Sequence, residues 1–433
     1  MFTRTLEKEL INWQKSSPRK PLVLRGARQV GKTSLIRQFG TNHYKQLLEI
    51  NLEKKDDLSY FNSSLSVEDF LDRLQNYHHT QINPVNTLIF IDEIQESQNI
   101  MELLRFFYEL RPDLHVIVAG SLLETKISSS HWSLPVGRIT NRYLYPLTFF
   151  EYLLAMDHPL PPQTLSPAQH EFYSLIFKDY LLIGGMPEVV SSFSRTYKYL
   201  DVSNTLEDLQ ITFLDDIRKY ARHLDQQKYL ELILSEGPKS AGSVFRYDGF
   251  GGSTYKSREI SAGFSTIENA LLLHQVKSLN STVLPLTPKL NRPKKLLWLD
   301  LGIVNHVSNV SKELITTTYQ GKLMEQYVGQ TLIALGIKEL FFWARDRDEG
   351  SAEVDFCFQL GGRVFAIEVK SGNSHQFKSL FSLANIDSSV TLIRISWDRF
   401  SLESHHHNGR DYQILSIPFY LVDRLFKIIS KVE

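Results

Sequence analysis

Short apolar runs alternate with helical patterns in the first third of the chain. Apolar spacing predicts helices at residues 32–39, where Leu35, Ile36 and Phe39 share one face, and at residues 102–110. Four apolar runs predict buried strands, at residues 22–25, 47–52, 88–91 and 115–119. Strands that alternate with helices usually form a parallel sheet, so an α/β domain is expected here.

The pattern becomes helical over residues 148–223, with two interruptions. The cluster Pro159-Leu160-Pro161-Pro162 predicts a loop or linker, and Gly184-Gly185-Met186-Pro187 marks a second break. Residues 226–307 are mixed in character and contain a glycine-rich stretch at 249–252. From about residue 321 a helix is expected, followed by strand-like runs at residues 340–343, 353–358, 364–370, 390–395 and 414–421.

Length and composition narrow the class of protein. A chain of 433 residues exceeds the size that one hydrophobic core usually supports, about 250–300 residues, so several domains are expected. The 48 basic residues balance the 48 acidic ones, so binding to nucleic acid would need a local patch. Cys357 is the one cysteine of the sequence, which excludes an intrachain disulfide and fits a reducing compartment. The N-terminus lacks the apolar region of a signal peptide, and no run reaches about 18 apolar residues; we therefore expect a cytoplasmic protein with no membrane partner.

A glycine-rich loop follows the first predicted strand. Residues 26–33 match the P-loop pattern G-x-x-x-x-G-K-[ST], in which backbone N–H groups surround phosphate oxygens. Lys32 would reach the β- and γ-phosphates, and the Thr33 hydroxyl would bind magnesium. We therefore expect ATP and Mg²⁺ as ligands. The predicted nucleotide-binding residues are Gly26, Ala27, Arg28, Gln29, Val30, Gly31, Lys32, Thr33 and Ser34.

The second half of this site is predicted at the ends of later strands. Asp92 and Glu93 follow the apolar run 88–91, at the strand end where α/β sheets bind ligands. Asp92 would hold the magnesium shell, and Glu93 would polarise the attacking water; a cap of the next helix is the alternative. Ser121 would touch the γ-phosphate or the water, or would be a plain turn serine. Arg138 is a candidate arginine finger in a neighbouring subunit, with a surface or salt-bridged arginine as the alternative.

A second group of charged residues lies near the C-terminus. Gly361-Gly362 between two strand-like runs predicts a two-residue hairpin loop, which would pair Asp355 with Glu368 and Glu353 with Lys370. Two facing carboxylates repel each other, so a second divalent cation between them is one reading. The other reading is a solvated hairpin face. Glu325, on the helix that begins near residue 321, is the candidate fourth acidic member of this nuclease-like site.

Two further clusters have weaker signals. Lys289, Arg292, Lys294 and Lys295 form a basic stretch that suits a phosphate backbone or, equally, a solvated loop. The run 405–407 contains three histidines and precedes Asn408-Gly409, which marks a turn; we read this run as a loop.

These motifs, in this order, resemble a large prokaryotic family of AAA-type ATP-binding proteins with a C-terminal domain of unknown function. The later landmarks of the resemblance are Gly137-Arg138, Tyr145-Pro146-Leu147-Thr148, Gly184-Gly185-Met186-Pro187-Glu188, Leu299-Asp300-Leu301-Gly302, Glu325, and Glu353-Val354-Asp355 with Glu368-Val369-Lys370. The resemblance implies an AAA-like core at residues 1–148 and a helical lid with a proline-rich insert at 149–227. It further implies a winged-helix-like middle region at 228–310 and a restriction-endonuclease-like α/β domain at 311–433. Residues 240–265 depart from the family's helix-turn-helix pattern, because they are rich in glycine and serine.

The sequence leaves three functions open. The first is a magnesium-dependent ATPase coupled to a nuclease-like domain that binds or cuts DNA, with a homo-oligomer as a further expected assembly. The second is an ATP-gated interaction switch whose C-terminal domain is a non-cleaving binding module. The third is a nucleotide-binding scaffold with negligible turnover.

Overall fold

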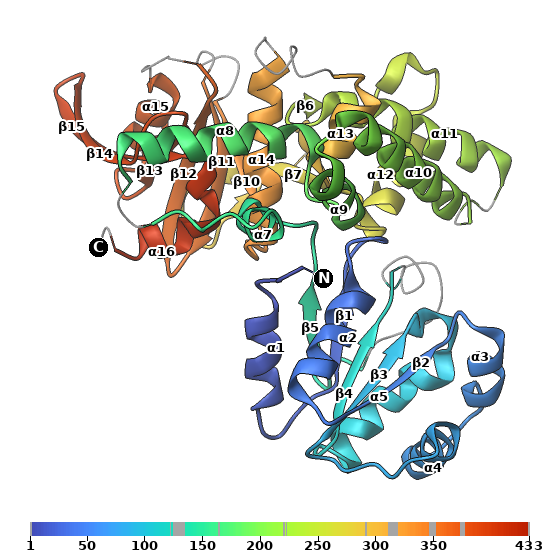
Figure 1. Ribbon diagram of the computed structural model, residues 1–433. Coiled ribbons are helices and arrows are strands. Elements are labelled where there is room, and N and C mark those ends of the chain that lie inside the picture. The colour runs from blue at the N-terminus through green and yellow to red at the C-terminus, as the bar shows by residue number, and fades with distance from the viewer. Residues whose placement is uncertain are drawn as a thin grey trace. The chain divides into compact units, whose positions relative to one another are not determined.

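The computed structural model describes the chain apart from residues 1, 122, 124–134, 163–164, 220, 222, 291, 311–318, 346–351, 373–376 and 432–433. The chain divides into two compact units (Figure 1). Unit 1 consists of Met1–Leu147 with Asn269–Leu272, and unit 2 consists of Thr148–Glu268 with Leu273–Glu433. None of the helices in the described part of the chain combines the length and apolar composition that a bilayer crossing requires.

Unit 1 contains the parallel sheet that the first third of the sequence predicts. Its described strands run in the order β2-β3-β4-β1-β5, and every neighbouring pair is parallel. The strands are β1 (Leu22–Arg25), β2 (Gln46–Asn51), β3 (Thr87–Asp92), β4 (His115–Ala119) and β5 (Thr140–Tyr143). The helices are α1 (Glu7–Gln14), α2 (Lys32–His43), α3 (Lys55–Phe61), α4 (Val67–His78) and α5 (Gln98–Leu110). The parallel α/β prediction is confirmed.

Alternation along the central strands gives the sheet two apolar faces. One face carries Ile89, Ile91 and Val118, which pack in one buried cluster with apolar residues of α3, α4 and α5. In α4 the buried side chains recur at helical spacing, and Ser66 forms a capping box with Asp69 at its start. Burial of each large apolar side chain contributes about 1.5–3 kcal/mol, so the helices fix the sheet and align the ends of its strands.

Unit 2 begins with the helical region that the sequence predicts. Its first helices are α7 (Phe149–Ala155), α8 (Pro167–Ile183), α9 (Pro187–Thr196), α10 (Tyr199–Arg218) and α11 (Leu224–Glu236). The proline cluster at 159–162 lies between α7 and α8, and the Gly184–Pro187 break separates α8 from α9. Later helices are α12 (Ser257–Asn269), α13 (Leu301–Val307), α14 (Tyr319–Ala334), α15 (Lys378–Ile386) and α16 (Leu425–Ile429).

A mixed sheet forms the rest of unit 2. Its described strands run in the order β14-β15-β13-β12-β11-β10-β7-β9-β6, with β8 paired to β7. The strands are β6 (Val244–Phe245), β7 (Leu273–Ser281), β8 (Thr287–Pro288), β9 (Lys294–Trp298), β10 (Phe341–Ala344), β11 (Glu353–Leu360), β12 (Arg363–Lys370), β13 (Thr391–Ser396), β14 (Ser401–His407) and β15 (Arg410–Pro418). Parallel pairing of β10 with β7 joins residues 228–310 to the C-terminal strands in one sheet. The winged-helix-like fold that the resemblance implies for residues 228–310 stays a prediction.

In the five pairs nearest its loop, the hairpin of β11 and β12 has the predicted register; the predicted pairs of Asp355 with Glu368 and of Glu353 with Lys370 lie beyond them. Phe358 pairs with Phe365 and Phe356 with Ile367, and Gly361 and Gly362 form the loop with positive φ angles of 56° and 77°. The predicted apolar face is wrong for Val354, which was expected to share a strand face with Phe356 and Phe358. Val354 instead packs in one cluster with Cys357 and α15, because the pairing of β11 with β10 shifts register between these two residues.

The three histidines lie in a strand. His405, His406 and His407 belong to β14, which pairs with β15 across the Asn408-Gly409 turn, so the loop reading is wrong. Because successive side chains of a strand point to opposite faces, neighbouring histidines have different partners. His405 contacts Glu403, whereas His406 contacts Asp411. No group of three or more potential metal ligands was found among the described residues.

Asp300 links two of the sequence landmarks. Its carboxylate caps α13 by accepting the Gly302 N–H at 2.8 Å, and it accepts the Gly185 N–H at 2.7 Å. A side chain at Gly184 would collide with it, because a Cβ there would lie 2.1 Å from Asp300 Oδ1. Burial raises the pKa of Asp300 to about 6, although these N–H groups act in the opposite direction.

The pH dependence of stability follows from the raised pKa of Asp300. A carboxyl whose pKa is higher in the folded state stabilises the fold fully below its unfolded pKa, and that contribution is lost as the pH rises through about 6. Replacement by Asn removes this dependence. The destabilisation caused by Asp300→Asn should therefore be of order 1–2 kcal/mol larger at pH 5 than at pH 7.5, measured by urea unfolding. Asp225→Asn, at an exposed position, is the control. A destabilisation by Asp300→Asn that increases with pH would contradict the raised pKa of Asp300.

Candidate functional sites

The P-loop is shaped by backbone angles that glycine favours. Gly26 has a φ of 152°, and a Cβ there would lie 2.4 Å from the carbonyl oxygen of Leu144. Gln29 and Gly31 also have positive φ angles, of 68° and 93°, and α2 begins directly afterwards at Lys32. The loop therefore turns its backbone between the end of β1 and the start of α2, as an anion site at a helix N-terminus requires.

Lys32 lies inside this loop. Its ammonium group donates hydrogen bonds to the carbonyl oxygens of Gly26 and Ala27, both at 2.9 Å, and the residue is 6% exposed. These acceptors are neutral. Phosphate oxygens would form stronger, charge-assisted hydrogen bonds with the same donor.

Thr33 and Asp92 are in direct contact. The Thr33 hydroxyl donates to Asp92 Oδ2 at 2.7 Å, and Asp92 Oδ1 accepts the Glu93 N–H. Burial raises the pKa of Asp92 to about 6, the Thr33 hydrogen bond opposes this rise, and the charge of Glu93 adds to it. A hydroxyl and a carboxylate at the phosphate loop are hard oxygen donors, so these two residues fit a Mg²⁺ ion shared with ATP.

Glu93 is held by two neighbouring side chains. Its Oε2 atom accepts hydrogen bonds from Gln95 Nε2 at 2.6 Å, from the Ser121 hydroxyl at 3.1 Å and from the Ser121 N–H at 3.3 Å. Strand β4 carries Ser121 to this position because it lies between β1 and β3. Sequence reasoning expected Ser121 at the phosphate or the water; in the structure its partner is Glu93.

Two contacts around the P-loop were not foreseen. Gln95 lies against Gly120, where a Cβ would meet its Oε1 at 2.4 Å; its position two residues after Glu93 was the available signal. Arg4 is buried and donates to the carbonyl of Val30 at 3.0 Å and to that of Tyr145. No motif marks Arg4 in the sequence, because its partners are backbone atoms far along the chain.

Arg138 forms a surface ion pair. Its Nε lies 3.2 Å from Glu109 Oε1, and Arg105 contacts the same carboxylate at 2.9 Å. The side chain of Arg138 is 46% exposed. This is the alternative that the sequence left open for Arg138, and a role in a neighbouring subunit stays a prediction.

In unit 2, the predicted carboxylates gather around a lysine. Lys295 Nζ lies 2.6 Å from Glu325 Oε2 on α14, and 3.3 Å from Glu353 Oε1 and 3.2 Å from Asp355 Oδ1 on β11. The Lys295 side chain is 1% exposed. Burial alone would lower the pKa of Lys295, but the charges of Asp355, Glu325 and Glu353 outweigh burial and raise it. We call Lys295, Glu325, Glu353 and Asp355 the lysine cluster.

Glu368 and Lys370 lie beside the lysine cluster. Lys370 Nζ donates to Glu368 Oε1 at 2.5 Å, and Asp355 Oδ2 accepts the Val369 N–H at 2.8 Å. Burial, followed by the charge of Asp355, raises the pKa of Glu368 to about 7 and that of Glu325 to about 8. The structure thus brings the four predicted residues together.

The sequence-based prediction for Lys295, a phosphate contact or a solvated loop, is wrong. It cannot serve as a surface contact for a phosphate backbone, because it is buried among carboxylates. Its neighbour Lys294 is partly buried and contacts Gln275 at 3.2 Å. Alternation along β9 was the available signal: two consecutive lysines in a strand must point to opposite faces.

The expected second cation does not fit this arrangement. The ammonium of Lys295 already lies among the carboxylates that the cation would need, and no group of three or more His, Cys, Asp or Glu side chains suited to a metal was found in the described part of the chain. Glu368 Oε2 is buried without a hydrogen-bond partner, but Glu368 Oε1 accepts a hydrogen bond from Lys370 Nζ.

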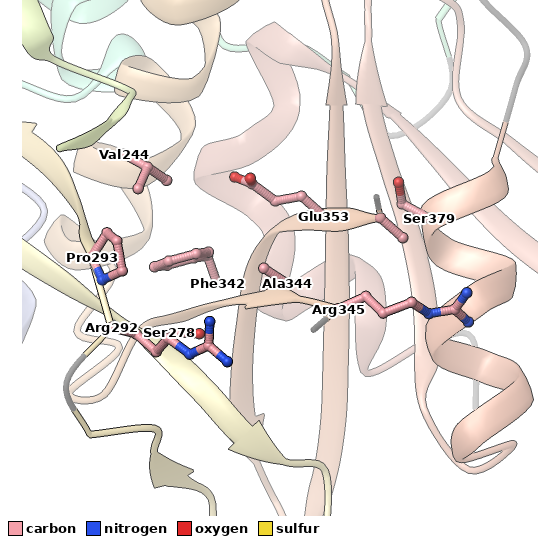
Figure 2. Close-up of a pocket in the computed structure, with 10 residues that line it drawn as sticks. Val244, Ser278, Arg292, Pro293, Phe342, Ala344, Arg345, Glu353 and Ser379 are labelled. Atoms are coloured by element: carbon pink, nitrogen blue, oxygen red, sulfur yellow. The ribbon is translucent and has the colours of Figure 1, made fainter. Parts of the chain in front are cut away.

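A cavity of about 570 Å³ opens beside the lysine cluster. Figure 2 shows Glu353 and Phe342 among the side chains that line it, with Arg292 and Arg345 along its other edge. The side chain of Glu353 is 45% exposed, whereas that of Lys295 is 1% exposed. A molecule in this cavity would therefore meet the Glu353 carboxylate and not the ammonium group.

Comparison with family models identifies three regions. A model described as an AAA domain matches residues 18–153. Two models described as domains of unknown function match residues 175–314 (DUF8612) and 320–416 (DUF4143). The chain thus carries an AAA-type P-loop ATPase domain followed by two domains of unknown function. A search of curated proteins finds no match.

Comparison with solved structures finds matches of low identity and low TM-score. The Aeropyrum pernix ORC1 protein in complex with DNA is 14% identical, with a TM-score of 0.28, over 70% of this chain and 90% of that chain. The Thermotoga maritima RuvB Holliday junction branch migration motor is 14% identical, with a TM-score of 0.28, over 67% of this chain and 93% of that chain. C. elegans PCH-2 is 11% identical, with a TM-score of 0.24, over 63% of this chain and 68% of that chain. Likeness at these TM-scores says nothing about what this chain binds.

Lys32→Ala tests the phosphate site. Loss of a hydrogen bond to a charged group costs about 1.5–3 kcal/mol, so ATP affinity should fall at least about tenfold. Calorimetric titration with ATP and magnesium measures the effect. Exposed Lys45→Ala should bind ATP like the wild type. Equal affinity of Lys32→Ala and wild type would contradict the assignment.

Proposed function

We propose that unit 1 binds ATP with magnesium and hydrolyses it. The observation that carries this proposal is the Glu93 carboxylate, which lies next in sequence to the magnesium-type residue Asp92 and is oriented by Gln95 and Ser121. The match of residues 18–153 to an AAA domain supports it.

Each residue has a distinct task in this proposal. The P-loop N–H groups and Lys32 hold the phosphates, and the Lys32 ammonium exchanges its carbonyl partners for phosphate oxygens. Thr33 and Asp92 supply the hydroxyl and carboxylate ligands of magnesium, which when bound neutralises charge that develops on the phosphates.

Glu93 acts on the attacking water. Its carboxylate accepts the water's proton, which raises the nucleophilicity of the oxygen at the γ-phosphorus. Because Oε2 is engaged by Gln95 and Ser121, the other oxygen, Oε1, is the one we assign to the water. General-base groups typically contribute about 10²–10⁴-fold to the rate.

Glu93→Gln should therefore bind ATP with wild-type affinity and hydrolyse it about 10²-fold or more slowly. The amide cannot accept the proton, but it preserves the size of the side chain. Phosphate release under single-turnover conditions measures the rate, and exposed Glu96→Gln, three residues along, is the matched control. A wild-type rate of ATP hydrolysis in Glu93→Gln would show that another residue is the general base.

We also propose that nucleotide state is passed from unit 1 to unit 2. The P-loop contacts the segment that leaves unit 1: Gly26 lies against the Leu144 carbonyl, and Arg4 joins Val30 to Tyr145. The first segment of unit 1 ends at Leu147, and Thr148 begins unit 2. A change in the loop on phosphate binding therefore has a short covalent route into unit 2.

Hydrogen exchange tests this coupling. ATP should change the exchange of amides at residues 144–152 in wild-type protein and in Glu93→Gln, but not in Lys32→Ala, because occupancy of the P-loop drives the change. An unchanged segment in ATP-saturated wild type would contradict the coupling. Under the same proposal, DNA and a second copy of the chain remain predicted partners of the coupled protein, with the non-cleaving interaction switch as the alternative.

A further inference from the structure

We propose that Lys295 is the built-in cation of the unit 2 carboxylate site, in place of the divalent metal that the sequence led us to expect. The lysine cluster then takes up no divalent cation, and it supplies no metal-activated water for phosphodiester cleavage. The inference goes beyond the proposed ATPase and is independent of it.

The first argument is the match between donors and acceptors. An ammonium group has three N–H donors, and Lys295 Nζ has a carboxylate oxygen of Glu325, Glu353 and Asp355 within 3.3 Å. These carboxylates come from α14 and β11, whereas Lys295 comes from β9. The lysine is therefore an internal cross-link between three elements, and its position at the centre of the cluster is the position a bridging metal would take.

The second argument is enclosure. The Lys295 side chain is 1% exposed, and its ammonium lies 5.2 Å from the ring centre of Phe356 and 5.8 Å from that of Phe342. Aromatic faces stabilise a cation at such distances. An entering metal ion would have to displace an ammonium group that is held by three carboxylates and bordered by two rings.

The third argument concerns the oxygens that remain. Asp355 Oδ1 accepts a hydrogen bond from Lys295 Nζ, and Asp355 Oδ2 accepts one from the Val369 N–H. Glu368 Oε1 accepts a hydrogen bond from Lys370 Nζ. Of the four carboxylate oxygens of Asp355 and Glu368, Glu368 Oε2 alone is left without a hydrogen-bond partner. A cation between these two carboxylates would therefore find one unengaged oxygen, whereas Mg²⁺ prefers a near-octahedral set of oxygens.

The experiment counts manganese bound to full-length protein without nucleotide, from the loss of the free Mn²⁺ signal in electron paramagnetic resonance. All proteins carry Asp92→Asn, which removes the unit 1 carboxylate. The parent protein should bind no stoichiometric Mn²⁺. Adding Lys295→Met should create one site per chain, because removal of the ammonium leaves its carboxylates for the ion. Adding Lys294→Met, the neighbour on the opposite face of β9, should create none.

Three results would overturn the proposal. One is Mn²⁺ bound to the parent protein and lost in Asp355→Asn. Another is a folded Lys295→Met protein that takes up no Mn²⁺. The third is equal uptake by Lys295→Met and Lys294→Met. Should Lys295→Met fail to fold, the parent and Asp355→Asn decide: no stoichiometric uptake by the parent supports Lys295 as the cation, and uptake that depends on Asp355 refutes it.

Discussion

A buried charge needs a compensating partner, and this constraint shapes both sites of the chain. Lys32 and Lys295 are each almost completely buried, at 6% and 1% exposed. The ammonium of Lys32 donates to two neutral carbonyls of its own loop, whereas that of Lys295 is surrounded by three carboxylates. An anionic ligand would give the Lys32 ammonium a stronger partner than the neutral carbonyls. At Lys295 the same ligand would have to compete with the three carboxylates.

The strand order of unit 1 brings the proposed catalytic residues together. Because β4 lies between β1 and β3, the ends of three neighbouring strands carry the P-loop, Ser121 and the Asp92-Glu93 pair. The buried faces of these strands hold their ends in line, so Thr33 meets Asp92 and Ser121 meets Glu93. Such preorganisation is what an electrostatic site requires, since little has to move when charge develops.

Local sequence predicted the features that depend on local chemistry. Apolar runs and glycine positions were enough for strands β1 to β4, for the P-loop and for the register of the β11–β12 hairpin near its loop, because alternation and turn geometry act over a few residues. Strand β5 was missed, because Thr140–Tyr143 contains no apolar run. The roles of Arg4 and Lys295 were missed, since each contacts partners that only the folded chain brings close. The role of Gln95 was missed although its partner Glu93 is two residues away. The sheet that joins β7 to β10 was also missed, because pairing between distant strands has no local signal.

The central claim is that the described part of the chain has one divalent metal site, which lies in unit 1 and forms together with ATP. The most direct measurement is the number of Mn²⁺ ions bound per chain in the presence of a non-hydrolysable ATP analogue. The account predicts one ion, which is lost in Asp92→Asn and kept in Asp355→Asn. A second ion, or a single ion that depends on Asp355, would contradict it.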